Sequence, residues 1–555
     1  MLTNAATIRT VNGLMMDFPL TLGAIFRHAD QVHPRREVVT RRADGSLHRY
    51  TYADFGGRVR RLVHALARLG VQPGDRVATL GWNHHQHLEA YFGVPMAGAV
   101  LHTLNLRLHP DEIAFIVNDA ADRVALVDES LLPLWEQIAP RTRVEHTVVV
   151  GAGGSVKEGH NEGYEGGYLE YEALLAGVPP LDAIPDGDER SAAAMCYTTG
   201  TTGRPKGVLY SHRALVLHAF AVALPSGMTL DERDVVLPVV PMFHANAWGL
   251  PYAAVMVGAK LVMPGPRLDP ASLVDLFARE RVTLTAGVPT IWMGILQYLD
   301  AHPGGHDVSS IRALFVGGAA APPSMIDAFE RRHGLRVIHA WGMTETTPLG
   351  TVSHVPADLA DASEDRKLEA RAKQGRPAPF VEIRARNEDG LVPWDGETMG
   401  ELEVRGPWVA SAYYNRTDCQ DRFTDDGWFR TGDIVTIDRR ATVSLQDRAK
   451  DLIKSGGEWI SSVSLESVLM GHPAVAEAAV IAVPSAKWGE RPLAAVVLRP
   501  GATATPDELR VFLAPRFPKF WLPDDFAFID AIPRTSAGKF RKDELRKRFG
   551  NLVIE

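Results

Sequence analysis

The sequence predicts an α/β fold: a large N-terminal domain of layered mixed sheets and helices, followed by a smaller α+β C-terminal domain. The chain has 555 residues, more than one ordinary hydrophobic core contains. Helix and strand signals alternate along its first part, and they restart beyond about Asp447 after a charged segment. We therefore predict domains at residues 1–447 and 448–555.

The alternation begins with two helix-to-strand units. A helix follows Thr51 with its apolar residues on one face, and the turn Pro73-Gly74-Asp75 then leads into a strand over residues 76–80. In the second unit, the helical stretch 111–120 runs into the strand-like residues 123–127. Alternation of this kind favours sheets that are covered by helices on both faces.

The C-terminal part has its own set of elements. Helices are predicted near residues 464–470 and 506–517, and strands at 474–483 and 493–498. About a hundred residues is a common size for a domain. We therefore expect this part to fold as a separate unit.

Composition excludes several classes of function. The 59 basic residues against 67 acidic ones give a net charge of -8, so the chain offers no broad cationic face to a nucleic acid. Two cysteines, Cys196 and Cys419, are too few for a disulfide framework and suit a reducing cytosol. The longest uncharged apolar run, residues 247–259, is shorter than the about 20 residues that a membrane span needs. We expect a cytoplasmic protein without a transmembrane segment, whose membrane contact would be peripheral.

The strongest chemical signal is the segment Tyr197 to Gly207, Tyr-Thr-Thr-Gly-Thr-Thr-Gly-Arg-Pro-Lys-Gly. Its glycines let backbone N–H groups turn toward an anion, while its hydroxyls and Lys206 add donors and charge, which suits a triphosphate. It is not a Walker loop, because no Gly-Lys-Ser/Thr sequence closes it. The predicted nucleotide-binding residues here are Thr198, Thr199, Gly200, Thr201, Thr202 and Lys206.

This segment resembles the phosphate-binding motif of the adenylate-forming superfamily, which includes acyl-CoA synthetases, firefly-type luciferases and peptide-synthetase adenylation domains. Further motifs agree in family order over about residues 20–545. The resemblance implies that ATP, Mg²⁺ and coenzyme A take part in the reaction. A carboxylic acid would first become an acyl-adenylate with release of pyrophosphate, and its acyl group would then pass to coenzyme A.

Two further segments complete the expected adenine and phosphate site. A strand-like stretch ends in Gly317-Gly318-Ala319, where a flat base can lie against the backbone. The segment His339 to Thr346, His-Ala-Trp-Gly-Met-Thr-Glu-Thr, resembles the second nucleotide motif of the family. By this resemblance, Trp341 stacks on adenine, Thr344 binds phosphate, and Glu345 holds Mg²⁺ with Thr198. The other residues predicted for this site are Gly318, Ala319, His339, Ala340 and Gly342.

The ribose and the hinge are expected next along the chain. Asp433 lies in a segment that resembles the ribose-binding motif, and its carboxylate can accept hydrogen bonds from both ribose hydroxyls. Residues 447–459 resemble the family's hinge and the glycine-rich loop after it, with Lys450 at the hinge position and Asp447 where a glycine is frequent. This segment adds Arg448, Lys450, Lys454 and Trp459 as nucleotide-site candidates.

The catalytic lysine is expected near the C-terminus. Pro533 to Lys539, Pro-Arg-Thr-Ser-Ala-Gly-Lys, matches the C-terminal catalytic motif of the family. By resemblance, Lys539 stabilises the negative charge that develops between the carboxylate and the α-phosphate. The C-terminal domain would then rotate about Lys450, which makes it mobile, so that coenzyme A can attack the adenylate. The predicted catalytic residues are Lys539, Glu345 and His244.

The acyl site is predicted from Pro241 to Gly249, Pro-Met-Phe-His-Ala-Asn-Ala-Trp-Gly, which resembles the acyl-site motif. Peptide-synthetase adenylation domains carry an aspartate where His244 stands, so amino acids are disfavoured as substrates. The uncharged runs 248–259 and 288–292 can line an apolar tunnel, in which each buried CH₂ of an acyl chain gains about 0.8 kcal/mol. The predicted substrate-binding residues are Ala245, Trp248, Val288 and Gly317, and Trp248 is our candidate for a gate of the tunnel.

Together these motifs predict an ATP-dependent fatty acyl-CoA synthetase, and they are most similar to bacterial medium- and long-chain enzymes. An aryl- or short-chain acyl-CoA ligase stays open as an alternative, as does a luciferase-like oxygenase that uses the adenylate with O₂. The resemblance also favours a homodimer.

Overall fold

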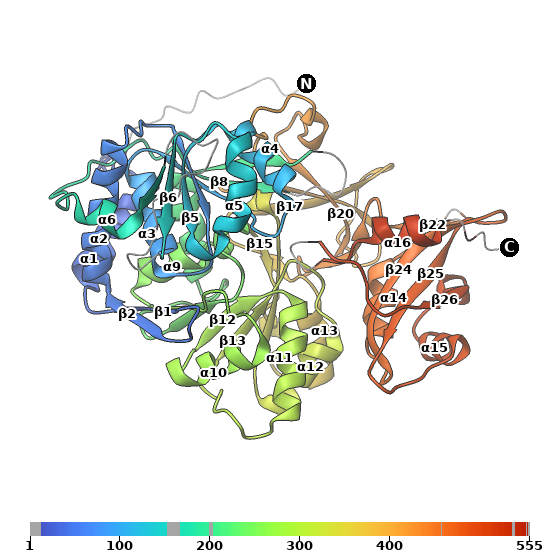
Figure 1. Ribbon diagram of the computed structural model, residues 1–555. Helices are drawn as coiled ribbons and strands as arrows, with labels where there is room; N and C mark the ends of the chain where they lie inside the picture. Colours follow the sequence, from blue (N-terminus) through green and yellow to red (C-terminus); the bar gives the residue numbers. More distant parts are fainter. Residues whose placement is uncertain are drawn as a thin grey trace.

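The computed structural model describes residues 13–151, 167–198, 204–456, 458–535, 539–550 and 552. Figure 1 shows a large part built from most of the chain and a smaller part formed by the C-terminal residues. Four of the predicted phosphate-binding residues, Thr199, Gly200, Thr201 and Thr202, lie outside the described residues.

The first sheet of the large part has seven strands and is parallel apart from its last pair. Its order is β7 (Tyr168–Glu170), β6 (His146–Val150), β5 (Asp122–Asp128), β3 (Arg76–Leu80), β4 (Val100–Thr103), β8 (Ala192–Thr198) and β9 (Lys206–Ser211). Strands β8 and β9 pair antiparallel, and Thr198 lies opposite Lys206. The strands predicted at 76–80 and 123–127 are thereby confirmed as β3 and β5.

The second sheet has nine strands, parallel in its middle and antiparallel at both edges. Its order is β16 (Arg376–Pro377), β15 (Leu349–Val352), β14 (Val337–Gly342), β13 (Ala313–Val316), β12 (Leu284–Gly287), β10 (Val235–Pro238), β11 (Lys260–Met263), β1 (Glu37–Arg41) and β2 (Leu47–Thr51). Strands β14, β13, β12, β10, β11 and β1 run in the same direction. Their carboxyl ends therefore meet along one edge.

Helices cover both faces of these two sheets, as the alternation predicts. The helices of the large part are α1 (Leu22–Val32), α2 (Tyr52–Arg68), α3 (His85–Met96), α4 (Pro110–Ala120), α5 (Leu132–Ile138), α6 (Tyr171–Ala176), α7 (His212–Ala223), α8 (Ala245–Trp248), α9 (Leu250–Val257), α10 (Pro270–Glu280), α11 (Pro289–Ala301), α12 (Pro323–His333) and α13 (Glu364–Ala372). Short 3₁₀ helices are η1 (Glu129–Leu131), η2 (Ala139–Arg141), η3 (Thr344–Thr346), η4 (Ala357–Leu359), η5 (Gln420–Arg422) and η6 (Lys519–Trp521).

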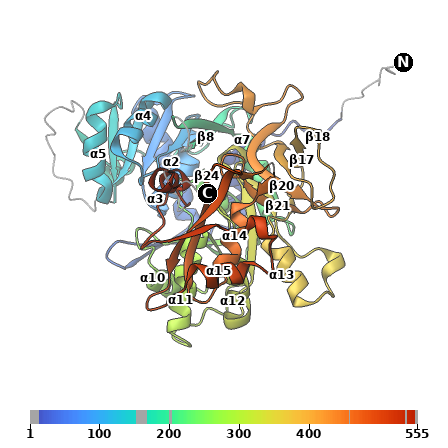
Figure 2. The same cartoon turned by 90° about the vertical axis from the view of Figure 1, so that its right-hand side faces the viewer.

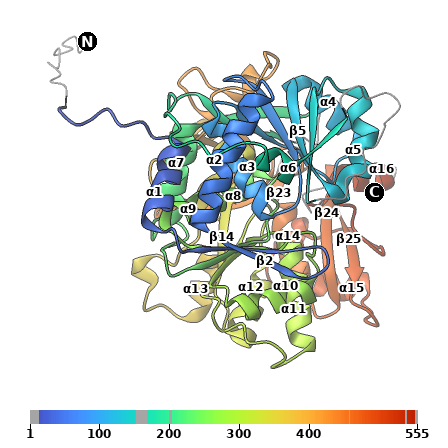
Figure 3. The ribbon, with the colours of Figure 1, turned by 60° about the vertical axis from the view of Figure 1, so that its left-hand side comes forward.

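One large hydrophobic core joins the two sheets. It contains residues of α1, α2, α3, α7 and α9, together with Val124 of the first sheet and Val236 of the second. A second core lies under α10, α11 and α12, and a third under α4 and α5. The layers therefore alternate between helices and sheets through the large part, and Figure 3 shows α10, α11 and α12 on its outer side.

A third, antiparallel sheet leads to the C-terminal part. Its order is β18 (Gly390–Leu391), β17 (Glu382–Asn387), β19 (Gly400–Arg405), β20 (Phe429–Ile437) and β21 (Val443–Arg448). Asp447 lies inside β21, so it occupies a strand rather than a turn that needs glycine. The next strand belongs to another sheet, which supports a boundary near residue 448, although the domain limits stay a prediction.

The C-terminal part is an α+β unit, which Figure 2 shows in front of the large part. Its sheet consists of β23 (Glu458–Ile460), β22 (Ile453–Ser455), β25 (Gly489–Leu498) and β24 (Val475–Ser485), with β26 (Asp525–Phe528) paired to β25. Its helices are α14 (Ser462–Leu469), α15 (Pro506–Leu513) and α16 (Lys542–Phe549). All four elements predicted for this part are present. In the described part of the chain, no helix is long and apolar enough to cross a bilayer.

Candidate active site

The second sheet creates a crevice where its strand order reverses. The chain passes from β10 to β11 on one side, and it then crosses over β10 to continue with β12, β13 and β14 on the other. Ligands of open α/β sheets bind beyond the carboxyl ends of the strands at such a reversal. His244 follows β10, Val288 follows β12, and Gly317 follows β13, so three predicted residues belong to this edge.

The predicted acyl-site residues meet there around the ring of Trp248. A Cβ atom placed on Gly317 would lie 2.9 Å from the carbonyl oxygen of Ala340 and 3.1 Å from the Trp248 ring. Gly318 has a φ of +80°, and a Cβ on it would lie 3.4 Å from Val288. The structure therefore brings Trp248, Val288 and Gly317 together, and the glycines leave the ring room to lie against the backbone.

A left-handed turn presents Trp248 to this crevice. Ala245, Asn246, Ala247 and Trp248 all have φ between +42° and +56°. This conformation is unfavourable for residues other than glycine and asparagine, so surrounding contacts must hold it. Cys196 Sγ donates to Asn246 Oδ1 at 2.8 Å, and Asn246 Nδ2 donates to the Tyr252 hydroxyl at 3.3 Å. The sequence analysis missed Asn246, although an asparagine inside the acyl motif is a signal for such a turn.

His244 begins this turn as a neutral imidazole. Its pKa is lowered to about 4, mainly by burial and also by the positive charges of Lys539 and Arg107. At neutral pH its ring therefore offers a hydrogen bond without a charge.

The nucleotide side joins residues from three strands. Trp341 of β14 donates its indole N–H to Asp433 Oδ2 of β20 at 2.8 Å. Arg448 Nε of β21 lies 2.7 Å from Asp433 Oδ1 as an ion pair. A Cβ on Gly350 would lie 2.3 Å from the Trp341 ring, so this glycine, which the sequence analysis also missed, makes room for the indole.

Asp433 keeps an acceptor for a ribose hydroxyl. Its side chain is only 1% exposed, and its Oδ1 accepts no hydrogen bond from the described residues, because the Arg448 N–H does not point at it in hydrogen-bond geometry. A buried carboxylate oxygen without a donor is costly, and a bound hydroxyl group would satisfy it. The residues present therefore fit a nucleotide, although Asp433 has one oxygen rather than two available for ribose.

The phosphate and metal candidates meet at the start of β9. Lys206 Nζ lies 5.0 Å from the centre of the Tyr413 ring, and the Tyr413 hydroxyl donates to Glu345 Oε1 at 2.6 Å. The Tyr210 hydroxyl donates to the carbonyl oxygen of Thr344 at 2.8 Å. Tyr413 was missed by the sequence analysis, because a tyrosine in a polar loop carries no signal of its partner 68 residues away.

These residues also fit Mg²⁺. No described residue donates to the second oxygen of Glu345, and Thr198 is the last residue of β8, a strand that contacts η3. Protein-bound Mg²⁺ commonly takes one or two carboxylates and completes its shell with phosphate oxygens and water. Among the described residues, no group of three or more His, Cys, Asp or Glu side chains is placed to hold a metal, and this mode of binding needs none.

Lys539 of the C-terminal part enters the same site. Its pKa is lowered to about 8, mainly by burial and also by the charges of Arg448 and Lys450, while those of Asp433 and Glu345 act in the opposite direction. Its backbone N–H donates to Thr535 Oγ1 at 3.1 Å. The lysine is therefore a cation under repulsion from neighbouring cations, placed among residues of the large part that were predicted to hold the nucleotide.

Four predicted nucleotide residues form no hydrogen bond or ion pair with Asp433 or Glu345 in the described part of the chain, although the charge of Lys450 acts on Lys539. Lys454 and Trp459 face each other across the β22–β23 pair, and no hydrogen bond or ion pair of the described residues joins them to Asp433. Lys450 and Ala319 are exposed. Roles of these four in nucleotide binding stay predictions.

Two further predicted residues, His339 and Gly342, determine how β14 packs. His339 is buried, and its Nδ1 lies 3.3 Å from the carbonyl oxygen of Ala372, so its side chain links β14 to the end of α13. A Cβ on Gly342 would lie 1.7 Å from the Pro348 carbonyl oxygen, which excludes a side chain there.

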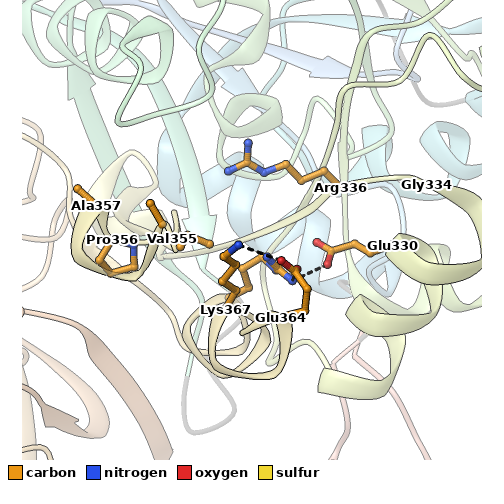
Figure 4. Close-up of a pocket in the computed structure, with 10 residues that line it drawn as sticks. Glu330, Gly334, Arg336, Val355, Pro356, Ala357, Glu364 and Lys367 are labelled. Carbon is orange, nitrogen blue, oxygen red and sulfur yellow. Dashed lines mark hydrogen bonds and ion pairs between the residues drawn. The ribbon is translucent and has the colours of Figure 1, made fainter. Parts of the chain in front are cut away.

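A separate pocket of about 450 Å³ lies between α12, α13 and η4 (Figure 4). Its charged residues largely pair with one another: Arg371 with Glu330 at 2.7 Å, and Lys367 with Glu364 at 2.9 Å. None of the predicted site residues lines it. It is therefore distinct from the candidate active site.

Comparisons with known proteins agree with this site. Residues 26–414 match the family model of AMP-binding enzymes, and residues 464–539 match the model of the AMP-binding enzyme C-terminal domain. The sequence is 52% identical over 541 residues to a long-chain-fatty-acid–CoA ligase of Thermus thermophilus, which covers 97% of each chain. It is 43% identical over 544 residues to a medium-chain-fatty-acid–CoA ligase of Ectopseudomonas oleovorans, which covers 98% of each.

Solved structures also match this chain over nearly its whole length. The crystal structure of ATP-bound MatB from Rhodopseudomonas palustris matches with a TM-score of 0.80 at 27% identity, over 96% of this chain and 99% of that one. An anthranilate CoA ligase in complex with anthranoyl-AMP shares the fold with a TM-score of 0.84 at 24% identity, over 96% of this chain and 98% of that one. The resemblance predicted from the motifs is thus confirmed, and the chain belongs to the family of AMP-binding enzymes.

Proposed function

We propose that this chain is an AMP-forming fatty acyl-CoA ligase, which converts a fatty acid, ATP and coenzyme A into acyl-CoA, AMP and diphosphate. The observation that carries the proposal is that Lys539 lies close enough to His244, Glu345 and Asp433 for its charge to act on them, near the apolar wall of Trp248 and Val288. The relatives named above support the substrate class.

In the first half of the reaction, a carboxylate oxygen of the acid attacks the α-phosphorus, and pyrophosphate leaves with its electron pair. No protein base is needed, because the acid is already ionised at neutral pH. The ammonium group of Lys539 stabilises the charge that develops between the two reactants, while Asp433 and Trp341 orient the nucleoside. Glu345 and Thr198 would hold Mg²⁺, which would supply positive charge to offset the triphosphate.

In the second half, the coenzyme A sulfur attacks the carbonyl carbon of the adenylate, the thiol gives up its proton, and AMP leaves. Lys539 occupies the site that serves the first half. We therefore propose that the C-terminal domain rotates about Lys450 between the halves and withdraws Lys539.

The acyl site suits an uncharged chain. Trp248 and Val288 present apolar surface, and His244 is neutral, so no charge is available to pair with a substrate amino group. A shorter acid is a second candidate, because the sequence is also 44% identical to a 3-methylmercaptopropionyl-CoA ligase of Ruegeria pomeroyi, over 98% of this chain and 99% of that one. The reaction is the same for both.

Product release tests the proposal. Pyrophosphate, AMP and thioester would be measured with the pure protein and MgATP, offering butyrate, octanoate, palmitate and cinnamate, each with and without coenzyme A. We expect thioester with octanoate or palmitate, and the series ranks chain length. Turnover confined to butyrate or cinnamate would favour the alternative ligases, and pyrophosphate without any thioester would favour an oxygenase or another acceptor.

We also propose that the protein is cytoplasmic with at most peripheral membrane contact, as its composition favours, and that it forms a homodimer, as the resemblance implies. Light scattering of the pure protein would give a mass near twice 60.6 kDa. A mass of one chain at all concentrations would contradict the dimer.

A further inference from the structure

The end of β21 is bonded to the first helix of the C-terminal part. Ser461 Oγ donates to the Gln446 carbonyl oxygen. The N–H and hydroxyl of Ser462 donate to Asp447 Oδ2 at 2.8 and 2.5 Å. The carboxylate thus lies at the N-terminus of α14, where the helix dipole favours a negative charge, and it is only 1% exposed.

Helix α16 completes this contact. Lys542, the first residue of α16, donates to Ser462 Oγ and lies 2.6 Å from Glu466. Glu466 in turn accepts a hydrogen bond from Val480 N at 2.7 Å. We call Asp447, Ser462, Glu466 and Lys542 the hinge cluster. Lys542 stands three residues after Lys539, so the cluster joins the catalytic loop to the end of the third sheet.

The hinge residues are held by the same helix. Arg546 of α16 pairs with Asp451 and reaches the Lys450 carbonyl oxygen at 3.4 Å. The residues on both sides of the proposed pivot are therefore tied to α16 in this orientation, in which Lys539 stands beside Asp433 and Glu345.

Rotation about Lys450 would divide the hinge cluster. Asp447 precedes the pivot and stays with β21, which pairs with β20 through Ile434. Ser462, Glu466 and Lys542 follow the pivot and move with the C-terminal domain. The bonds of Asp447 to Ser462 must then break, although a buried carboxylate that loses its donors is costly. These bonds belong to one of the two orientations only.

We propose that Asp447 is a positioning residue that latches the C-terminal domain in the orientation for adenylation. Its carboxylate binds Ser462, and Ser462 binds Lys542, which lies three residues after Lys539 and so fixes Lys539 in the site. The latch opens for attack by coenzyme A. The frequent family glycine at this position could not form it. This inference rests on the proposed function and on its rotation about Lys450.

The two half-reactions test the latch separately. Pyrophosphate release would be measured in a single turnover with octanoate and MgATP, and thioester formation would be measured from supplied octanoyl-adenylate and coenzyme A. For Asp447→Ala in the full-length protein, we expect pyrophosphate release to slow about tenfold or more, because the productive orientation is less populated. Thioester formation from the supplied adenylate should stay unchanged or rise.

Two further variants control the experiment. Ser462→Ala removes the hydroxyl between Asp447 and Lys542. It should also slow pyrophosphate release without slowing thioester formation, so it tests the latch if Asp447→Ala does not fold. Asp438→Asn is the matched control: Asp438 accepts hydrogen bonds from two backbone N–H groups in the β20–β21 turn, away from α14, and its variant should leave the ratio of the two rates unchanged.

Failure of the proposed latch and failure of the proposed function give different results. If Asp447→Ala and Ser462→Ala slow both half-reactions by the same factor, or slow neither, the latch is wrong and the ligase function stands. If the wild-type protein releases no pyrophosphate with any acid, the proposed function itself fails.

Discussion

At the scale of single residues, the proposed mechanism depends on Lys539 carrying a proton. Burial and the neighbouring charges of Arg448 and Lys450 hold its pKa at about 8, below the ordinary value for lysine. An amine is charged only below its pKa. The lysine is therefore cationic at neutral pH and loses its charge in mildly alkaline solution.

We therefore predict an alkaline limb for adenylation. The ratio kcat/KM for ATP in pyrophosphate release should fall as pH rises through about 8, because the free enzyme then loses the cation that stabilises the developing charge. His244 is neutral above about pH 5 and adds no limb in this range. Lys539→Arg should lack the limb at a lower overall rate. A wild-type profile that stays level to pH 10 would show that Lys539 does not act as a cation.

Trp248 gives a second prediction at this scale. Trp248→Ala removes the ring that lies against Gly317, so it should change the ratio of kcat/KM for palmitate to that for octanoate. Trp394→Ala, at an exposed tryptophan, is the matched control. An unchanged ratio and unchanged acyl affinity in Trp248→Ala would remove Trp248 as the gate.

Much of the residue-level site follows from the sequence, because its motifs name Trp341, Asp433 and Lys539. The contacts between these side chains do not follow from the sequence. The Trp341 indole binds Asp433 across 92 positions, and Tyr413 binds Glu345 across 68. Contacts at such separations depend on how the sheets pack, which no local pattern records.

At the scale of elements, the acyl turn is the least predictable feature. Ala-Asn-Ala-Trp has an ordinary composition, yet all four residues are left-handed, because tertiary bonds from Cys196 and Tyr252 hold Asn246. By contrast, β3 and β5 lie where the alternation predicts them, since parallel buried strands are marked by continuous apolar residues.

The strain of this turn can be measured. Asn246→Ala and Asn246→Gly both lose the two hydrogen bonds, but only glycine adopts a positive φ without cost. We expect Asn246→Ala to be the less stable variant, by about 1 kcal/mol in the free energy of unfolding from denaturant titration. Equal stabilities, or a less stable glycine variant, would mean that the turn is not strained.

At the scale of the whole molecule, the proposed site is shared between the two predicted domains. The C-terminal domain contributes Lys539, and the large domain contributes Glu345 and Asp433. The sequence predicts both domains from the restart of secondary-structure signals after Asp447. It does not reveal the order of the strands, so the crevice between β10 and β12 becomes visible only in the structure.

Because Lys539 is proposed to serve only adenylation, its substitution should slow one half-reaction much more than the other. Lys539→Ala should slow pyrophosphate release by about 10²–10³-fold, as loss of a preorganised donor does. Thioester formation from supplied octanoyl-adenylate should be nearly unchanged, because Lys539 has left the site by then. Equal losses in both halves would place Lys539 in both steps and contradict the rotation.

The central claim is that the acid attacks the α-phosphorus of ATP. The most direct measurement uses octanoate with both carboxylate oxygens replaced by ¹⁸O, and follows the label by mass spectrometry after one turnover with MgATP and coenzyme A. The account predicts one ¹⁸O in AMP, one in octanoyl-CoA and none in pyrophosphate. Label in pyrophosphate, or AMP without label, would contradict it.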